Sequence, residues 1–276
     1  VFIYSQSIGP LSGINKKLCT YILNKIDLIT VRDEITMDKL ISYGVKDSKI
    51  YVAADAAFAM DLDKKAPLDK YKLEDHYPID ENKLIISVSV RKWNYYNNEN
   101  GHGEYVKTFA EALDYLVRNK NAQIVFASTC SGFAGYHTDD RVVAFEIIKK
   151  MKYSQNNVKV LTSELTPQEL VEFYKKIDLH IGTRMHSNIL ALLANTPIVP
   201  IEYEFKTRGL MDFFEIDDVI SIEDISSEKI IFLVNKFLAE YDEVKTLIQK
   251  KITILKFKAK EPAYLMKDFY YEGGQK

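Results

Sequence analysis

Two arginines and a histidine have side chains that could bind and protonate a small anion: Arg91, Arg184 and His186. Arginine presents a planar fork of N–H donors that holds a carboxylate or phosphate bidentately. Histidine changes its charge near neutral pH, so it can donate a proton during a reaction. A helix is expected directly after Arg184 and His186, and its backbone N–H groups would add further donors. This combination predicts an anion pocket beside a proton donor.

Further polar and aromatic side chains extend this candidate site. A lysine and two hydroxyls could contribute to the anion pocket, whereas aromatic rings and a carboxylate suit a sugar. The predicted donor-binding residues are Arg184, Arg91, Lys206, Thr183 and Ser187, and the predicted acceptor-binding residues are Trp93, Tyr95, Tyr96, Glu164 and Tyr203. Each type has a structural alternative, because strand-end arginines often form surface ion pairs, aromatic rings can cover a linker and a histidine can cap a helix.

Two other polar features are predicted to be structural. His180 stands in the middle of an apolar strand, so we expect a buried packing residue rather than a ligand. Asp139 and Asp140 precede an amphipathic segment, and carboxylates at that position cap helices.

Short apolar runs alternate with amphipathic helices from Leu84 onwards, and this alternation would position the candidate residues. Strands are predicted at Leu84–Val90, Gln123–Ala127, Val158–Leu161, Ile177–Ile181, Ile198–Ile201 and Val219–Ile222, and helices at Glu104–Arg118, Asp140–Tyr153, Pro167–Lys175, Ser187–Ala194, Thr207–Phe214 and from about Ser227 to Leu255. Thr166 and Glu169 form a capping-box pattern around Pro167. The alternation predicts a parallel, doubly wound sheet, which binds ligands beyond the carboxyl ends of its strands. The candidate residues follow such strand ends.

Residues 1–60 show a shorter alternation of the same kind. Strands are predicted from Val1, at Leu28–Val31 and at Ile50–Phe58, with helices at Asn15–Lys25 and Glu34–Tyr43. We therefore expect an α/β fold with two Rossmann-like doubly wound parallel-sheet domains, the first incomplete because the chain opens directly on a strand. The predicted parts are the first domain at 1–60, a polar linker at 61–82, a donor-binding domain at 83–258, and a tail at 259–276 that could dock on the first domain.

The composition excludes several other classes of protein. Apolar residues make up 47% and charged residues 28%, as in globular proteins, and a net charge of −2 gives no cationic field for nucleic acid. Two cysteines without clustered histidines predict neither a disulfide framework nor a zinc site. The absence of Walker and GxGxxG loops predicts no cofactor. The two cysteines fit a reducing, cytoplasmic setting. No apolar run reaches the roughly 20 residues of a membrane span, so we expect a soluble protein, with a peripheral place at the inner membrane left open.

Several segments of the sequence resemble the polysaccharide pyruvyl transferase family. The matching segments are Ser5–Leu11, Val31–Glu34 with Leu40 and Gly44, Ala54–Phe58, Ser87–Arg91, Gly182–His186 and Tyr203–Gly209. Their order and spacing carry the resemblance, and the segment Gly-x-Arg-(Leu/Met)-His is the most specific of them. The sequence departs from the common pattern at Met185, where leucine is usual, and at Ser5 and Ser7, where glycine is frequent.

The resemblance implies a glycosyltransferase-B-like (GT-B-like) pair of Rossmann domains with the active site in the cleft. It also implies transfer of a pyruvyl group from phosphoenolpyruvate to a sugar of a cell-surface or secreted polysaccharide, as a ketal and without a cofactor. Arg184 and His186 match positions linked to donor binding and catalysis, with Arg91 as a companion. The implied partners are phosphoenolpyruvate and a glycan acceptor that can be lipid-linked.

Two alternatives stay open on the same architecture. A glycosyltransferase that uses a nucleotide sugar could hold its diphosphate with Arg184 and Lys206, because one fold supports many reactions. A glycan-binding module could keep the cleft and lack the chemistry.

Overall fold

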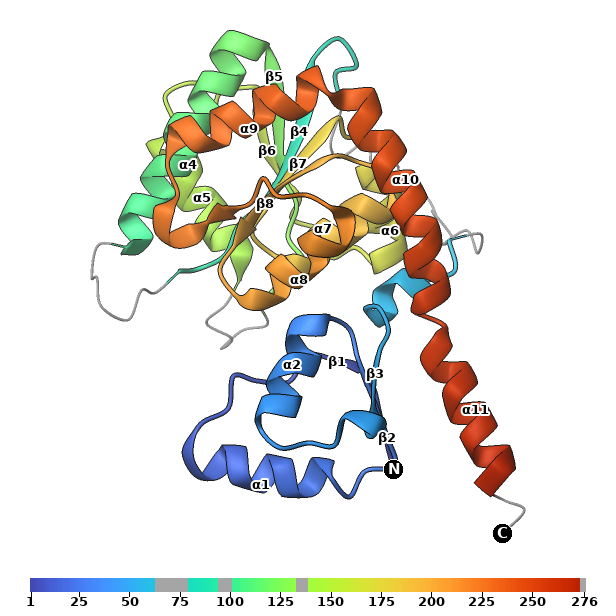
Figure 1. The fold of residues 1–276 in the computed structure, drawn as a ribbon. Helices are drawn as coiled ribbons and strands as arrows, with labels where there is room; N and C mark the ends of the chain where they lie inside the picture. Colours follow the sequence, from blue (N-terminus) through green and yellow to red (C-terminus); the bar gives the residue numbers. More distant parts are fainter. Residues whose placement is uncertain (63–78, 94–100, 133–138, 274–276) are drawn as a thin grey trace. The chain divides into compact units, whose positions relative to one another are not determined.

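The computed structural model describes residues 1–62, 79–93, 101–132 and 139–273 (Figure 1). The chain divides into two compact units. The first unit comprises Val1–Asp61, Arg208–Glu215 and Lys250–Lys276, and the second comprises Leu62–Thr207 and Ile216–Gln249. Most of the predicted linker lies outside the described residues, so its boundaries stay a prediction. No helix in the described ranges is both long and apolar enough to cross a bilayer.

Six parallel strands form the sheet of the second unit, in the order β6-β5-β4-β7-β8-β9. They are β4 (Leu84–Ser89), β5 (Ala122–Phe126), β6 (Val158–Val160), β7 (Leu179–Gly182), β8 (Ile198–Glu202) and β9 (Ile220–Ser221). The central strands are buried along almost their whole length, which is why they are nearly continuous apolar runs. The predicted doubly wound parallel sheet is confirmed.

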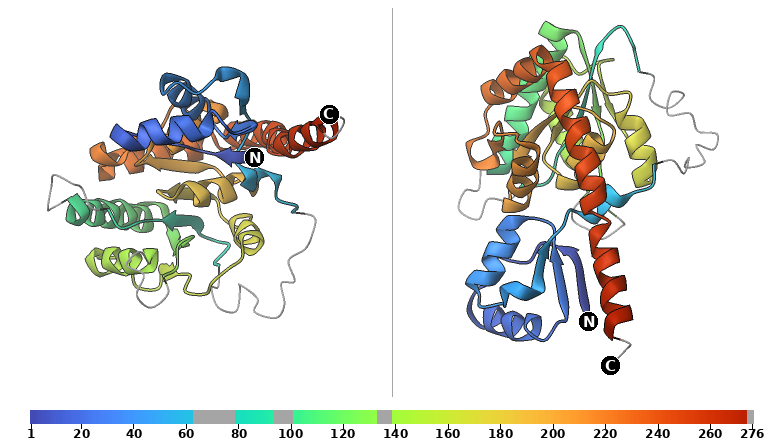
Figure 2. Two further views of the ribbon diagram at one scale, coloured as in Figure 1. Left: turned by 90° about the horizontal axis from the view of Figure 1, so that it is seen from below. Right: turned by 45° about the vertical axis from the view of Figure 1, so that its right-hand side comes forward.

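Helices cover both faces of this sheet (Figure 2). They are α4 (Gly101–Lys120), α5 (Asp140–Lys150), α6 (Pro167–Tyr174), α7 (Met185–Leu193) and α9 (Ser227–Ala239). Helix α4 packs against α5 and α9, whereas α6 packs against α7. Right-handed crossovers require this division, because the direction along the sheet reverses between β6 and β7. The predicted capping box starts α6, where Thr166 and Glu169 accept each other's backbone N–H groups.

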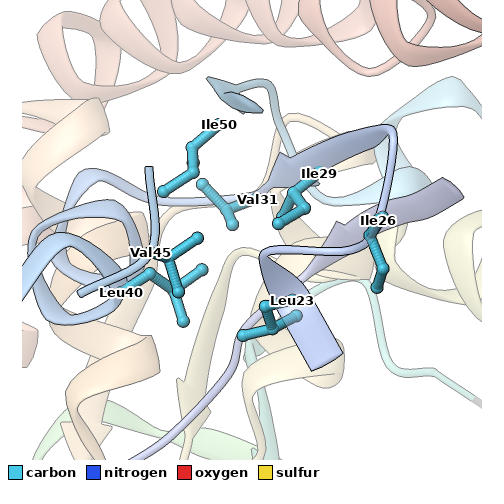
Figure 3. Close-up of a cluster of buried hydrophobic side chains, with 7 residues drawn as sticks. All are labelled: Leu23, Ile26, Ile29, Val31, Leu40, Val45 and Ile50. Atoms are coloured by element: carbon cyan, nitrogen blue, oxygen red, sulfur yellow. The ribbon is translucent and has the colours of Figure 1, made fainter. Parts of the chain in front are cut away.

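Three parallel strands form the sheet of the first unit, in the order β1 (Phe2–Gln6), β2 (Leu28–Val31) and β3 (Ile50–Val52). Helices α1 (Gly13–Leu23) and α2 (Glu34–Ser42) belong to the same unit. The apolar cluster of this unit consists of Leu23, Ile26, Ile29, Val31, Leu40, Val45 and Ile50 (Figure 3). The last helix, α11 (Glu261–Gly273), packs on β1, where the rings of Phe2 and Phe269 meet edge to face at 5.5 Å.

Two predicted elements end earlier than expected. The single helix predicted from about Ser227 to Leu255 is wrong, because Glu240 has a non-helical backbone and separates α9 from α10 (Tyr241–Lys258). No glycine or proline marks this break in the sequence. The strand predicted at Ile50–Phe58 stops at Val52. The side chain of Asp55 then accepts the N–H of Ala57 and starts a 3₁₀ turn.

Among the helices that begin earlier than predicted, α7 and α4 affect the candidate site. Helix α7 begins at Met185 rather than Ser187, so His186 lies in its first turn. Helix α4 begins at Gly101 rather than Glu104. Residues 94–100, which include the predicted acceptor residues Tyr95 and Tyr96, lie outside the described residues.

Candidate active site

The sheet brings the segments that carry Arg91 and Arg184 side by side. Strand β4 pairs with β7, and Ser89 lies opposite Gly182. Arg91 and Arg184 each follow this pair by two residues, at the carboxyl edge where parallel sheets bind ligands. Strand order therefore places the two arginine-bearing segments next to each other, although they are distant in the sequence.

Asp140 holds the guanidinium of Arg184. Arg184 Nε donates to Asp140 Oδ2 at 2.9 Å, and Nη2 donates to Oδ1 at 2.6 Å. The Asp140 side chain is 2% exposed and the Arg184 side chain 20% exposed, so the pair is largely buried. Burial lowers the pKa of the Arg184 guanidinium, but the hydrogen bond with Asp140 and the attraction of Asp140 and other nearby groups together outweigh burial, so the pKa is raised.

The structure corrects the role predicted for Asp140. Asp139 alone is the N-cap of α5, because its carboxylate accepts the backbone N–H of Arg141. Asp140 instead pairs with Arg184, a role in the site that was not predicted from the sequence. The only sign of this role in the sequence was that two carboxylates stand side by side. One carboxylate is enough to cap a helix, so the other is available for a different partner.

The hydroxyls of Thr183 and Ser187 are buried rather than open to a ligand. Both side chains are 0% exposed. Thr183 Oγ1 lies 2.8 Å from Tyr105 Oη, and Ser187 Oγ donates to the carbonyl oxygen of Arg184 at 2.7 Å. In this structure both hydroxyls form hydrogen bonds inside the protein, and their predicted contacts with the donor stay predictions. These hydroxyls fix the turn between β7 and α7 that carries Arg184.

His180 lies in a buried cluster of hydroxyls beneath that turn. Its Nδ1 is 2.7 Å from Ser87 Oγ, and its Nε2 is 3.1 Å from Ser187 Oγ. The side chain is 0% exposed, and burial lowers the pKa of His180 to about 3. His180 is therefore a neutral, buried structural residue at neutral pH, as its apolar surroundings in the sequence predicted.

We expect the second unit to lose stability in acid through His180. A histidine in the unfolded chain has a pKa of about 6.5. Below that pH the His180 ring binds a proton in the unfolded chain but not in the folded protein. The contribution of His180 to the free energy of unfolding is fully present above about pH 6.5. It falls by about 1.4 kcal/mol for each pH unit between there and pH 3. The loss at pH 5 is therefore about 2 kcal/mol.

Urea unfolding followed by the fluorescence of Trp93, the only tryptophan, measures this loss. In the His180→Gln variant the free energy of unfolding should change less between pH 7 and pH 5 than in the native protein. Equal changes in the two proteins would contradict the neutral buried ring.

His186 is exposed in the first turn of α7. Among the described residues, no group forms a hydrogen bond with its ring. The first N–H groups of a helix lack intrahelical partners, so the ring stands beside free donors that favour an anion. The ring is thus accessible to a ligand, and its role as a proton donor stays a prediction.

Arg91 stacks on the ring of Tyr203, which follows β8. The guanidinium carbon lies 3.9 Å from the ring centroid, a cation–π contact. Trp93 meets the same ring edge-on, with the centroids 6.2 Å apart. No carboxylate among the described residues forms an ion pair with Arg91, although its charge acts on Asp140. The structure therefore joins a predicted donor residue to two predicted acceptor residues.

His102 anchors the backbone of Trp93. The N–H of Trp93 donates to His102 Nδ1 at 3.3 Å, and His102 Nε2 lies 2.8 Å from Glu146 Oε2. Because Nδ1 accepts, the proton of the neutral ring lies on Nε2 and is donated to Glu146. Neither His102 nor Glu146 was predicted to belong to the site, because nothing in the local sequence shows that α4 and α5 are neighbours.

Lys206 and Glu164 have partners of their own. Lys206 Nζ lies 3.3 Å from Glu204 Oε2, which offsets its charge. Glu164 is exposed and accepts a hydrogen bond from Ser131 Oγ at 3.2 Å. Their predicted contacts with donor and acceptor stay predictions.

The first unit contains a separate polar network at the carboxyl edge of its own sheet. Arg32 donates to Asp55 Oδ2 at 2.6 Å and to Ser7 Oγ, and Ser7 in turn donates to Asp33 Oδ2 at 2.8 Å. Gly209 packs against Asp33, because a Cβ on Gly209 would lie 2.9 Å from the Asp33 Cβ. These residues belong to four of the segments that carry the family resemblance, and they contact one another within this unit.

Comparison with solved structures defines the class of fold. The UDP-GlcNAc 2-epimerase of Neisseria meningitidis bound to UDP-GlcNAc matches with a TM-score of 0.65 and 14% identity, over 92% of this chain and 64% of that one. A glycosyltransferase of Rickettsia africae ESF-5 matches with a TM-score of 0.65 and 13% identity, over 98% of this chain and 70% of that one. At such identity the likeness shows the fold alone, and these neighbours place the protein among α/β proteins of the GT-B type.

Sequence comparison gives the family. The model of the polysaccharide pyruvyl transferase family matches residues 1–204, so the chain belongs to that family. The amylovoran biosynthesis protein AmsJ of Erwinia amylovora is 25% identical over 261 residues, which are 91% of this chain and 61% of that protein. The chain therefore spans less than two thirds of the length of this relative.

Proposed function

We propose that the protein transfers a pyruvyl group from phosphoenolpyruvate to a sugar of a polysaccharide and forms a pyruvate ketal. The observation that carries the proposal is the segment Gly182–His186. In a chain of the pyruvyl transferase family, this segment presents an exposed histidine two residues after an arginine that Asp140 holds in place. Membership of the family supports an enzymatic role, and the relative in amylovoran biosynthesis supports a polysaccharide as the acceptor.

The proposed chemistry needs one acid and two anion-binding groups. His186 would protonate the methylene carbon of phosphoenolpyruvate, which makes the neighbouring carbon electrophilic. One sugar hydroxyl adds to that carbon, phosphate leaves, and a second hydroxyl closes the ketal. Of the two protons that the hydroxyls release, one restores His186 and the other leaves with phosphate. Arg91 and Arg184 would hold the carboxylate and phosphate, and fixed donors of this kind stabilise charge that develops during a reaction.

The reaction is tested by phosphate release from phosphoenolpyruvate across a set of acceptor glycans, with the whole protein. We expect release only when both substrates are present. Arg184→Lys should raise the donor dissociation constant about 10-fold or more, because lysine cannot reproduce the bidentate fork. Lys175→Ala is the matched control, since this lysine forms an exposed ion pair with Glu172 and should leave both quantities unchanged within about two-fold.

Donor binding separates this proposal from the alternatives. A ligand at 100 times its dissociation constant adds about 2.7 kcal/mol to stability, which thermal unfolding detects. Stabilisation by phosphoenolpyruvate but not by nucleotide sugars is the expected result. The reverse pattern would show the proposal to be wrong and favour a glycosyltransferase. Stabilisation without turnover of any donor would favour a glycan-binding module.

A further inference from the structure

We infer that Asp140 is the positioning residue of the donor site: it fixes the orientation of Arg184 and cancels its charge, so that Arg91 supplies the net attraction for the anionic donor. This inference rests on the proposed function and goes beyond it, because it assigns different roles to the two arginines. It follows from the geometry of the ion pair, its burial and the surroundings of Arg91.

The ion pair leaves one edge of the Arg184 guanidinium free. Asp140 accepts from Nε and Nη2, which is the side of the fork that faces the helix α5. Among the described residues, nothing accepts a hydrogen bond from Nη1. The two N–H groups of Nη1 and the second N–H of Nη2 therefore point away from Asp140. That edge can bind a carboxylate or phosphate bidentately while the pair stays intact.

The burial of the pair makes this orientation rigid. With 2% exposure, the Asp140 carboxylate has almost no contact with water and depends on Arg184 for its hydrogen bonds. Asp140 is also the first residue of α5, and the adjacent Asp139 caps that helix, so the carboxylate stands on a fixed backbone. Arg184 in turn is the N-cap of α7, with its carbonyl bound by Ser187. Both partners are therefore fixed at helix ends.

The charges of the two arginines are not equivalent. Arg184 with Asp140 forms a neutral pair, so the pair contributes directed donors and little net charge. Arg91 lies on the Tyr203 ring and forms no ion pair with a described carboxylate. The long-range attraction for a multiply charged donor therefore comes mainly from Arg91, whereas Arg184 sets the geometry in which the donor reacts. Loss of Asp140 should therefore disturb the geometry of donor binding through Arg184.

A double-mutant cycle in the whole protein tests this dependence. We expect Asp140→Asn and Arg184→Gln each to lower kcat/KM for phosphoenolpyruvate about 10- to 100-fold, since the first removes the orientation of the Arg184 donors and the second removes the donors themselves. The double variant should be no worse than Arg184→Gln alone, within about three-fold. Multiplied losses in the double variant would mean that Asp140 acts independently of Arg184 and would overturn the inference.

The matched control is the neighbouring carboxylate. Asp139→Asn keeps a good helix cap and should leave kcat/KM within about three-fold of the native value. If the Asp140→Asn variant does not fold, comparing the kcat/KM of Arg184→Gln with that of the double variant still tests the inference. The double variant is expected to fold because it leaves no unpaired buried charge. Native kcat/KM in a folded Asp140→Asn would also overturn the inference. If the native protein neither binds nor turns over phosphoenolpyruvate, the proposed function fails rather than this cycle.

The second readout is the salt dependence of donor binding. Arg91→Gln should flatten the dependence of the donor dissociation constant on ionic strength, because it removes the uncompensated charge. The double variant Asp140→Asn, Arg184→Gln should change that dependence less, since it removes a neutral pair and leaves the net charge of the site unchanged. The opposite order would contradict the division of roles between the two arginines.

Discussion

Replacement of His186 by alanine should lower the turnover number about 100- to 10,000-fold, the usual contribution of a general acid. The donor dissociation constant should stay within a few-fold, because Arg91 and Arg184 remain in place. Phosphate release gives the turnover number, and calorimetry with phosphoenolpyruvate gives the dissociation constant. The fold should not suffer, since the ring is exposed and forms no hydrogen bond within the described part of the chain.

His186→Gln separates proton transfer from simple contact. Glutamine keeps a hydrogen-bonding side chain of similar reach but cannot deliver a proton, so its turnover should be as low as that of the alanine variant. Turnover near the native value in either variant would assign the acid to another group. Glu164, which is exposed after β6, is then the next candidate.

Replacement of Gly182 by alanine should destabilise the second unit strongly. Gly182 is the last residue of β7, and a Cβ there would overlap Asn188 Oδ1 and lie 2.7 Å from His180 Nε2. Asn188 and His180 are both fully buried, and Asn188 Nδ2 donates to the carbonyl oxygen of Gly182 at 3.1 Å. Overpacking and the loss of this buried hydrogen bond together should cost about 2 to 6 kcal/mol.

Gly103→Ala is the matched control for that prediction. Gly103 is exposed in α4, and no atom lies within 4 Å of the position its Cβ would take. Alanine in a helix should leave stability unchanged or raise it by up to about 1 kcal/mol. Urea unfolding followed by Trp93 fluorescence measures both variants. A loss below about 1 kcal/mol for Gly182→Ala would contradict the tight contact seen at this turn.

Much of the fold could be predicted from the sequence because its signals are local. Apolar runs bounded by helices located the strands of both sheets, and the capping box of Thr166 and Glu169 located the start of α6. The prediction failed at Glu240, because no glycine or proline marks the end of α9 there. The assignment of Arg208–Glu215 and of residues 250–258 to the first unit was not predicted either, since it depends on contacts far along the chain.

The sequence by itself determined the chemical character of the candidate site: two arginines, a histidine and aromatic residues after the ends of parallel strands, in segments typical of the pyruvyl transferase family. The tertiary structure decided which of these side chains meet. It paired Arg184 with Asp140, which lies 44 residues away, stacked Arg91 on Tyr203, and buried Thr183 and Ser187. The physical reason is that residue type and spacing define what a side chain can bind, whereas strand order and helix packing define its neighbours.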